Sequence, residues 1–196
     1  MISMSERIRS FIAIEIEEQG VLAKIIRIKN SISDLGLDIK PVEDENIHIT
    51  IRFLGEITLT TLNEIKNILN NVTKIVKPFT IGVKGIGAFP NALRPRVIWV
   101  GISEGFDNLV AIRKYVDNEI MRLKLIDVHR DEHEFSPHIT IARVKSLRNI
   151  NKFIEFYQSY KDFEFGVSPV SKIKLKQSTL TPRGPIYKDI HVVNLM

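Results

Sequence analysis

The sequence has no cysteine among its 196 residues and only one tryptophan. The absence of cysteine excludes disulfides, thiol nucleophiles and cysteine-based zinc sites within this sequence. Long apolar runs are also missing, because runs such as Val97–Val100 are far shorter than the roughly 20 residues that cross a bilayer. Ser5–Arg7 precede an apolar stretch that alternates with polar residues, unlike a secretory signal. We therefore expect a cytoplasmic protein without a membrane segment.

The composition is otherwise that of an ordinary soluble domain. Hydrophobic residues make up 44% of the chain and charged residues 26%, enough apolar material for a real core. The formal net charge of +5 favours polyanionic partners such as nucleic acid, although solvated surface lysines explain so modest an excess equally well. We expect residues 1–196 to form a single domain with two lobes, present as a monomer.

A short motif occurs twice. His48–Ile51 reads HITI, and His138–Ile141 reads HITI again, 90 residues further along the chain. In a strand, side chains alternate between the two faces, so each histidine shares a face with its threonine while the isoleucines face the core. If the two strands lie side by side, two imidazoles and two hydroxyls face one cleft.

The surrounding pattern mixes strands and helices. Apolar alternation and short apolar runs predict strands at residues 9–17, 38–42, 47–54, 79–88, 96–103, 138–144, 163–167, 171–180 and 186–195. Helical spacing predicts helices at residues 21–35, 62–72, 107–124 and 150–157, with Thr61–Glu64 as a capping box and Ser146 as a cap. Many strands are joined by short turns, which favours an α+β fold with largely antiparallel sheets, and the strand–helix–strand order around each HITI copy predicts two related halves.

The paired histidines suit acid–base chemistry on a phosphate. Opening a cyclic phosphodiester with water needs one group that takes a proton from water and another that protonates the leaving ribose oxygen. Histidine suits both roles because its ordinary pKa is about 6.5, and each positioned acid or base is worth about 10² to 10⁴ in rate. The threonine hydroxyls can bind the non-bridging oxygens, so neither metal nor cofactor is required. One HxT strand alone would indicate a satisfied structural histidine, whereas the pair favours catalysis.

Five segments resemble one enzyme family. HITIRFLGE (residues 48–56) and SPHITIARV (residues 136–144) resemble the two signature motifs of the two-histidine phosphoesterases, in particular the RNA 2′,3′-cyclic phosphodiesterase branch, also called 2′-5′ RNA ligase-like. RSFIAIEI (9–16), PRVIWVGI (95–102) and RGPIYKDI (183–190) extend the resemblance over nearly the whole chain. It implies a bilobal α+β fold, with two pseudo-symmetric antiparallel sheets, flanking helices and a basic central cleft. It also implies metal-independent hydrolysis of RNA 2′,3′-cyclic phosphate ends to 2′-phosphates.

The motif positions transfer directly to this chain. The resemblance implies that His48 and His138 are catalytic and that Thr50, Thr140 and Arg143 bind substrate. We assign His48 as the acid for the leaving 3′-oxygen and His138 as the base for water, although the symmetry leaves the reverse assignment open. By strict alternation Arg143 lies on the face opposite His138, unless the strand bends or bulges.

Other residues near the motifs have two interpretations each. Arg52 shares the His48 face by parity, so it either reaches the cleft or is a surface charge. Phe53 and Trp99 are expected in the core. Four further residues either contact RNA or have ordinary structural roles: Phe11, Arg94, Arg96 and Tyr187. His129 and His133 have the i,i+4 spacing of a zinc helix, but Pro137 interrupts it before His138, so no metal site is expected.

Three functions remain possible at this point. Hydrolysis of an RNA with a 2′,3′-cyclic phosphate end, tRNA-derived ends included, fits the motifs. Ligation to a 5′-hydroxyl is the reverse reaction and uses the same residues. A non-catalytic module that binds nucleotides or RNA is the third, and the two intact His-Thr pairs count against it.

Overall fold

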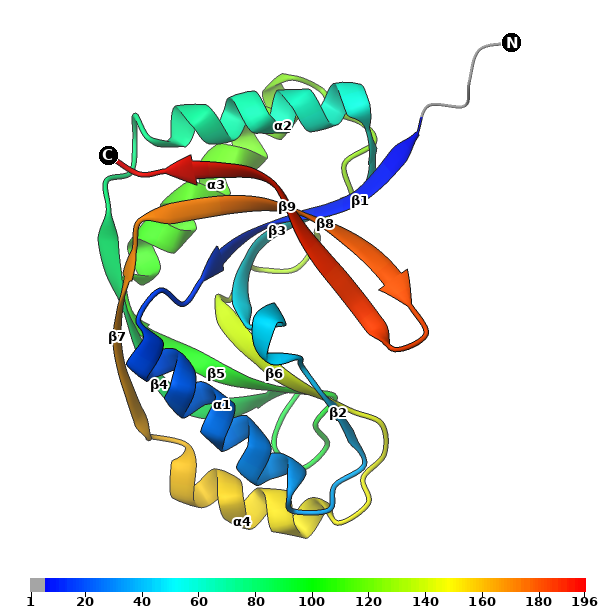
Figure 1. The fold of residues 1–196 in the computed structure, drawn as a ribbon, viewed down its shortest axis with the longest axis vertical. Helices are drawn as coiled ribbons and strands as arrows, with labels where there is room; N and C mark the ends of the chain where they lie inside the picture. The colour runs from blue at the N-terminus through cyan, green and yellow to red at the C-terminus, as the bar shows by residue number, and fades with distance from the viewer. Residues whose placement is uncertain (1–5) are drawn as a thin grey trace.

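The computed structural model describes residues 6–196 (Figure 1). The strands are β1 (Arg7–Glu15), β2 (Ile39–Pro41), β3 (His48–Thr58), β4 (Phe79–Phe89), β5 (Val97–Glu104), β6 (His138–Val144), β7 (Glu164–Val170), β8 (Lys172–Thr181) and β9 (Gly184–Asn194). The helices are α1 (Gln19–Ser33), α2 (Leu59–Val72), α3 (Phe106–Arg122) and α4 (Ile150–Tyr160), with a short 3₁₀ helix, η1 (Asp44–Asn46). Within residues 6–196 no helix has both the length and the apolar character to cross a membrane. Ser5, where the segment examined for a secretory signal starts, lies outside the described residues.

All strand pairs are antiparallel, which confirms the predicted α+β class. The strands follow the order β7-β4-β5-β6-β3-β1-β8-β9, and β2 adds to β6. The strands divide into two lobes (Figure 1). One lobe contains β1, β3, β8 and β9 with α2 and α3, and the other contains β2 and β4 to β7 with α1 and α4.

The two lobes meet at the repeated motif. A single backbone pair, Ile49 opposite Ile139, joins β3 to β6 and makes one continuous sheet of the two halves. Ile49, Ile51, Ile139 and Ile141 are all fully buried. Burying a side chain of this size stabilises the fold by about 1.5–3 kcal/mol, so these isoleucines fix which face of each strand points inward. His48 and His138 are therefore held on the opposite face.

The predicted helix caps are wrong by one turn or less. Helix α2 begins at Leu59, and the Thr58 side chain accepts the Thr61 amide at 3.3 Å, so Thr58 is the cap in place of Thr61. The Thr61 hydroxyl instead donates to Asp127 at 2.7 Å. Ser146 does not cap α4, because its hydroxyl donates to Asp38 at 2.6 Å while Asn149, with φ 56°, precedes the helix.

Candidate active site

A cavity of about 310 Å³ lies between the two lobes and contains the predicted site. It is lined by His48, Thr50, His138, Thr140 and Arg143, together with Phe11, Lys40, Pro41, Val42, Glu43, Asn46, Phe53, Arg183, Gly184, Pro185 and Tyr187. Three of the strands that contribute, β1, β3 and β6, are adjacent in the sheet. The structure thus brings together all five residues that the sequence predicted for the site.

The two histidines are oriented in the same way. His48 Nδ1 lies 2.7 Å from the Asn46 carbonyl oxygen, and His138 Nδ1 lies 2.7 Å from the Ser136 carbonyl oxygen. A carbonyl oxygen only accepts, so each Nδ1 carries the proton and donates it. In the neutral rings Nε2 is then the free base, and the same tautomer is set in both lobes by the residue two positions earlier.

Thr50 contacts the free nitrogen of its own motif. Its hydroxyl lies 3.0 Å from His48 Nε2 and donates to it in this tautomer. The donor is therefore placed beside the nitrogen that can exchange a proton with a bound group. Thr140 lines the same cavity from the second lobe.

Matching β-bulges follow the two motifs. In the pairing of β3 with β1, Ala13 lies opposite Thr50 and Ile12 opposite Arg52, so the register skips Ile51. In the pairing of β6 with β5, Trp99 lies opposite Thr140 and Ile98 opposite Ala142, so it skips Ile141. A bulge moves the following side chains to the other face of the strand.

The bulges correct two predictions and resolve a third. Phe53 lines the cavity rather than the core, and Arg52 is buried on the other face, away from His48. Arg143 turns into the cavity, as the bulged alternative required. Phe53 and Arg143 occupy equivalent positions, five residues after each histidine. The symmetric strands therefore present an aromatic ring on one side and a guanidinium on the other.

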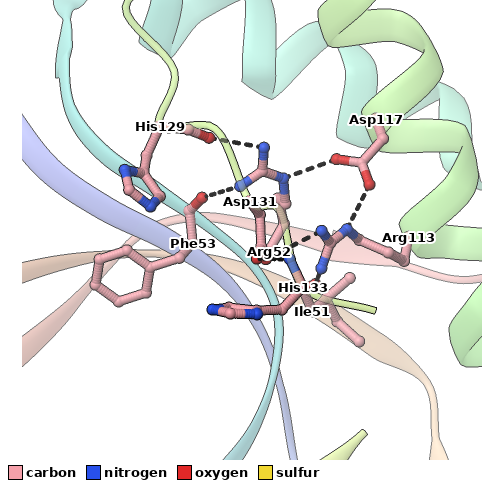
Figure 2. A network of polar contacts seen from close by, with 8 residues as sticks. All are labelled: Ile51, Arg52, Phe53, Arg113, Asp117, His129, Asp131 and His133. Carbon is pink, nitrogen blue, oxygen red and sulfur yellow. Dashed lines mark hydrogen bonds and ion pairs between the residues drawn. The ribbon is translucent and has the colours of Figure 1, made fainter. Parts of the chain in front are cut away.

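Arg52 belongs to a polar network behind the site (Figure 2). Its guanidinium donates to Asp117 at 2.7 Å, to the Phe53 carbonyl at 2.6 Å and to the His129 carbonyl at 2.8 Å. Arg113 shares Asp117 and donates to the carbonyl of the bulged Ile51 at 3.1 Å. In the second lobe the Val42 amide fills this role, donating to the Ile141 carbonyl at 2.9 Å. Each bulge is thus stabilised by a hydrogen-bond donor for the carbonyl of the buried residue that the register skips.

The same network anchors the loop before His138. Arg113 donates to Asp131 at 3.1 Å, and its guanidinium lies 5.3 Å from the Phe135 ring centre. This segment contains no helix among its described residues 123–137, so His129 and His133 do not share a helical face. Within residues 6–196 no three His, Cys, Asp or Glu side chains are grouped to hold a metal ion.

Aromatic rings surround both histidines. Phe11 and Tyr187 lie 5.1 and 5.6 Å from the His48 ring, measured between centroids. Phe89 and Trp99 lie 5.0 and 6.2 Å from the His138 ring. Trp99 is half-buried on the His138 face, so its predicted place in the core is wrong.

Of the four further residues considered for RNA contact, two line the cavity and two do not. Arg94 and Arg96 are exposed and are not among the cavity-lining residues, whereas Phe11 and Tyr187 are. Sequence reasoning missed Lys40, Asn46 and Arg183, which line the cavity. Lys40 and Asn46 carry no local motif that would identify them, whereas Arg183 opens the RGPIYKDI segment but was given no role there.

Burial lowers the pKa of both histidines. The pKa of His48 falls from 6.5 to about 4, chiefly because burial disfavours the charged ring, and the ammonium of Lys176 lowers it further. Burial also lowers the pKa of His138, with a smaller contribution from the positive charge of Arg143. Both rings are therefore neutral near pH 7 in the ligand-free protein, and an anion in the cavity would favour their protonation.

The chain is similar to known proteins over nearly its full length. Residues 10–195 match the family described as the AKAP7 2′5′ RNA ligase-like domain. A Methanocaldococcus jannaschii protein named RNA 2′,3′-cyclic phosphodiesterase is 41% identical over 182 residues, 93% of this chain and 98% of the relative. An Aeropyrum pernix protein of the same name is 39% identical over 173 residues, 88% of this chain and 96% of the relative.

Solved structures share the fold at lower sequence identity. A Thermus thermophilus protein superimposes with a TM-score of 0.80 at 24% identity, covering 95% of this chain and 97% of that one. Escherichia coli LigT, solved as a complex with 3′-AMP, superimposes with a TM-score of 0.75 at 20% identity, covering 97% of this chain and 99% of that one.

Proposed function

The chain belongs to the 2′5′ RNA ligase-like family of two-histidine phosphoesterases, and we propose that it hydrolyses RNA 2′,3′-cyclic phosphate ends to 2′-phosphates with His48 and His138 as its acid–base pair. Relatives that are 33–41% identical over most of the chain carry the name RNA 2′,3′-cyclic phosphodiesterase. The observation that carries the residue assignment is the cavity itself, because one histidine from each lobe lines it in the same tautomer.

The reaction follows from placing the cyclic phosphate between the two rings. His138 Nε2 takes a proton from water as the water attacks phosphorus, and protonated His48 gives a proton to the leaving 3′-oxygen through Nε2. The bond from phosphorus to the 3′-oxygen breaks and the phosphate stays on the 2′-oxygen, which leaves His48 neutral and His138 protonated. Release of the His138 proton to solvent with the product returns both rings to the neutral state of the ligand-free protein, and the next substrate again favours protonation of His48. Thr50, Thr140 and Arg143 bind the non-bridging oxygens, where negative charge builds in the transition state.

Substrate binding supplies the proton state that this scheme needs. Two neutral histidines, as in the ligand-free protein, provide a base but no acid. The negative charge of the bound phosphate raises the pKa of the nearby rings, so one of them becomes protonated only when substrate is present. Because burial lowers the pKa of His138, this ring stays unprotonated, and so able to accept a proton from water, over a wide pH range.

Ligation is the second candidate function. The matching family is described as 2′5′ RNA ligase-like, and the reverse of ring opening, with a 5′-hydroxyl in place of water, uses the same acid and base. A non-catalytic binding module is disfavoured, because such a module would not need both histidines in matched orientation. We further propose that the enzyme acts as a cytoplasmic monomer, on ends that include those of tRNA fragments. The two lobes of one chain together place both histidines in the cavity, which supports catalysis by a monomer.

The test is to locate the phosphate after the reaction. The protein is incubated in EDTA with an oligonucleotide that ends in a 2′,3′-cyclic phosphate, with and without a second RNA carrying a 5′-hydroxyl. Hydrolysis predicts a 2′-phosphate end in both mixtures, whereas ligation predicts a longer RNA only in the second. Cyclic ends that remain intact in both mixtures would contradict the proposed function.

A further inference from the structure

The cavity carries more positive charge than one phosphate requires. Lys40, Arg143 and Arg183 all line it, whereas Glu43 is the one carboxylate among the described residues of the lining. The three cations come from three separate parts of the fold: β2, β6 and the turn between β8 and β9. All three side chains are exposed and can meet a ligand.

These cations converge at one end of the cavity. Lys40 lies directly opposite Arg143 in the antiparallel pairing of β2 with β6, so both side chains project from the same face. A Cβ atom added to Gly184 would lie 3.2 Å from Lys40 Nζ, so the ammonium rests against the turn that carries Arg183. The hairpin is held there by Asn46, whose side-chain amide donates to the Pro185 carbonyl at 3.2 Å.

The three cations have no acidic partner within the described part of the chain. None of the ion pairs among residues 6–196 includes Lys40, Arg143 or Arg183. By contrast, the cations on β8 do have acidic partners: Lys174 and Lys176 each pair with both Glu15 and Asp189. Like charges opposite each other on adjacent strands are destabilising, so the arrangement at Lys40 and Arg143 suits an anionic ligand.

We propose that Lys40 and Arg183 form a subsite for a second phosphate of the substrate, the phosphodiester that joins the terminal nucleotide to the one before it. This inference rests on the proposed function and deepens it. Arg143 lies five residues after His138 on β6 and serves the cyclic phosphate, while Lys40 lies beside Arg143 on the adjacent strand and the turn that carries Arg183 rests against Lys40. The subsite makes the enzyme selective for RNA ends over free nucleoside 2′,3′-cyclic phosphates.

Two substrates separate the subsite from the reaction centre. One is a nucleoside 2′,3′-cyclic phosphate, and the other is the dinucleotide with the same cyclic end and one additional phosphodiester. The readout is the ratio of kcat/KM for the dinucleotide to kcat/KM for the mononucleotide. We expect Lys40→Gln and Arg183→Gln each to lower this ratio about fivefold, as for an exposed ion pair. The double variant should lower it further but by a factor other than the product of the two, because both cations contact the same phosphate and their effects are coupled.

A matched control lies on the same hairpin. Lys188 is exposed on β9, next to Tyr187 but pointing to the other face, and does not line the cavity. Lys188→Gln removes the same net charge and should keep the wild-type ratio. The wild-type kcat/KM should also fall more steeply with salt for the dinucleotide, by about 0.7 in the log–log slope for one additional phosphate contact.

The possible results separate a failure of the second-phosphate subsite from a failure of the proposed phosphodiesterase function. A wild-type ratio near one, an unchanged ratio in the Lys40 and Arg183 variants, or an equal loss for both substrates would overturn the subsite. An equal fall of the kcat/KM ratio in Lys188→Gln would mean that net charge alone sets the preference for the dinucleotide, and this result would also overturn the subsite. A wild-type protein that turns over neither substrate would instead overturn the proposed function.

Discussion

Phosphate binding should raise the pKa of His48 by about two units. In the ligand-free protein burial holds that pKa at about 4. A unit negative charge about 5 Å from the ring, at an effective dielectric constant of about 20, stabilises the imidazolium by about 3.3 kcal/mol, which is about 2.4 pKa units. The pKa of His48 would then be about 6.4, and its protonated fraction at pH 7 would rise from about 0.1% to about a fifth.

The shift can be measured residue by residue. The ring signals of the five histidines are followed by NMR from pH 8 to pH 4. His48→Gln and His138→Gln identify the two signals from the cavity. The titration is repeated with a non-hydrolysable nucleoside 2′,3′-cyclic phosphonate, whose negative charge does not change over this range. His129, His133 and His191 lie outside the cavity lining and serve as internal controls.

Two results would refute the reasoning. The first is a His48 that titrates near 6.5 without ligand, which would mean that burial does not set its pKa. The second is a pKa that moves by less than about half a unit on binding, which would place the ligand's charge far from the ring.

Three further predictions test separate parts of the site. Thr50→Val and Thr140→Val should each lower kcat about 10²- to 10³-fold at an unchanged circular dichroism spectrum, because one donor to the phosphate is lost. Wild-type kcat in either variant would contradict the assigned role. Asp117→Ala should lower the free energy of unfolding in urea by about 3 kcal/mol, because Arg52 and Arg113 lose their shared partner, and a loss below about 1 kcal/mol would contradict the network's role. Wild-type stability should also fall as pH drops from 6.5 towards 4, by up to about 3 kcal/mol more than in His48→Gln, because the folded pKa lies below the unfolded one; parallel curves for the two proteins would show otherwise.

The HITI repeats were enough to predict the centre of the site. Period-two alternation placed His48 with Thr50 and His138 with Thr140, and the buried isoleucines fixed the face. The strand and helix pattern also predicted the α+β class. That residues 1–196 form a single domain stays a prediction, as do the catalytic roles of the five site residues.

Alternation failed after each motif because a bulge leaves no signature in one sequence. Nothing in the local pattern marks Ile51 or Ile141 as the residue that the register skips. The bulge at Ile51 depends on Arg113, and the position of Arg52 on Asp117, both more than 60 residues away in the chain. Contacts at such separation become visible only in the folded structure, which is why Arg52 and Phe53 were placed on the wrong faces.

The same reason explains the missed cavity residues. Lys40 comes from a three-residue strand, and Arg183 from a hairpin turn at the other end of the chain. Each looks like a solvated charge in its own segment. Their proximity results from the pairing of β2 with β6 and from the contact of Asn46 with Pro185.

The central claim is that His48 and His138 act as a pair on one phosphorus atom. The most direct measurement is kcat on a 2′,3′-cyclic-ended oligonucleotide for His48→Ala, His138→Ala and the double variant. Two groups that act as a unit predict that each single variant loses nearly as much activity as the double, at least about 10³-fold. Losses that multiply in the double variant, or a single variant that keeps a tenth of wild-type kcat, would contradict the claim.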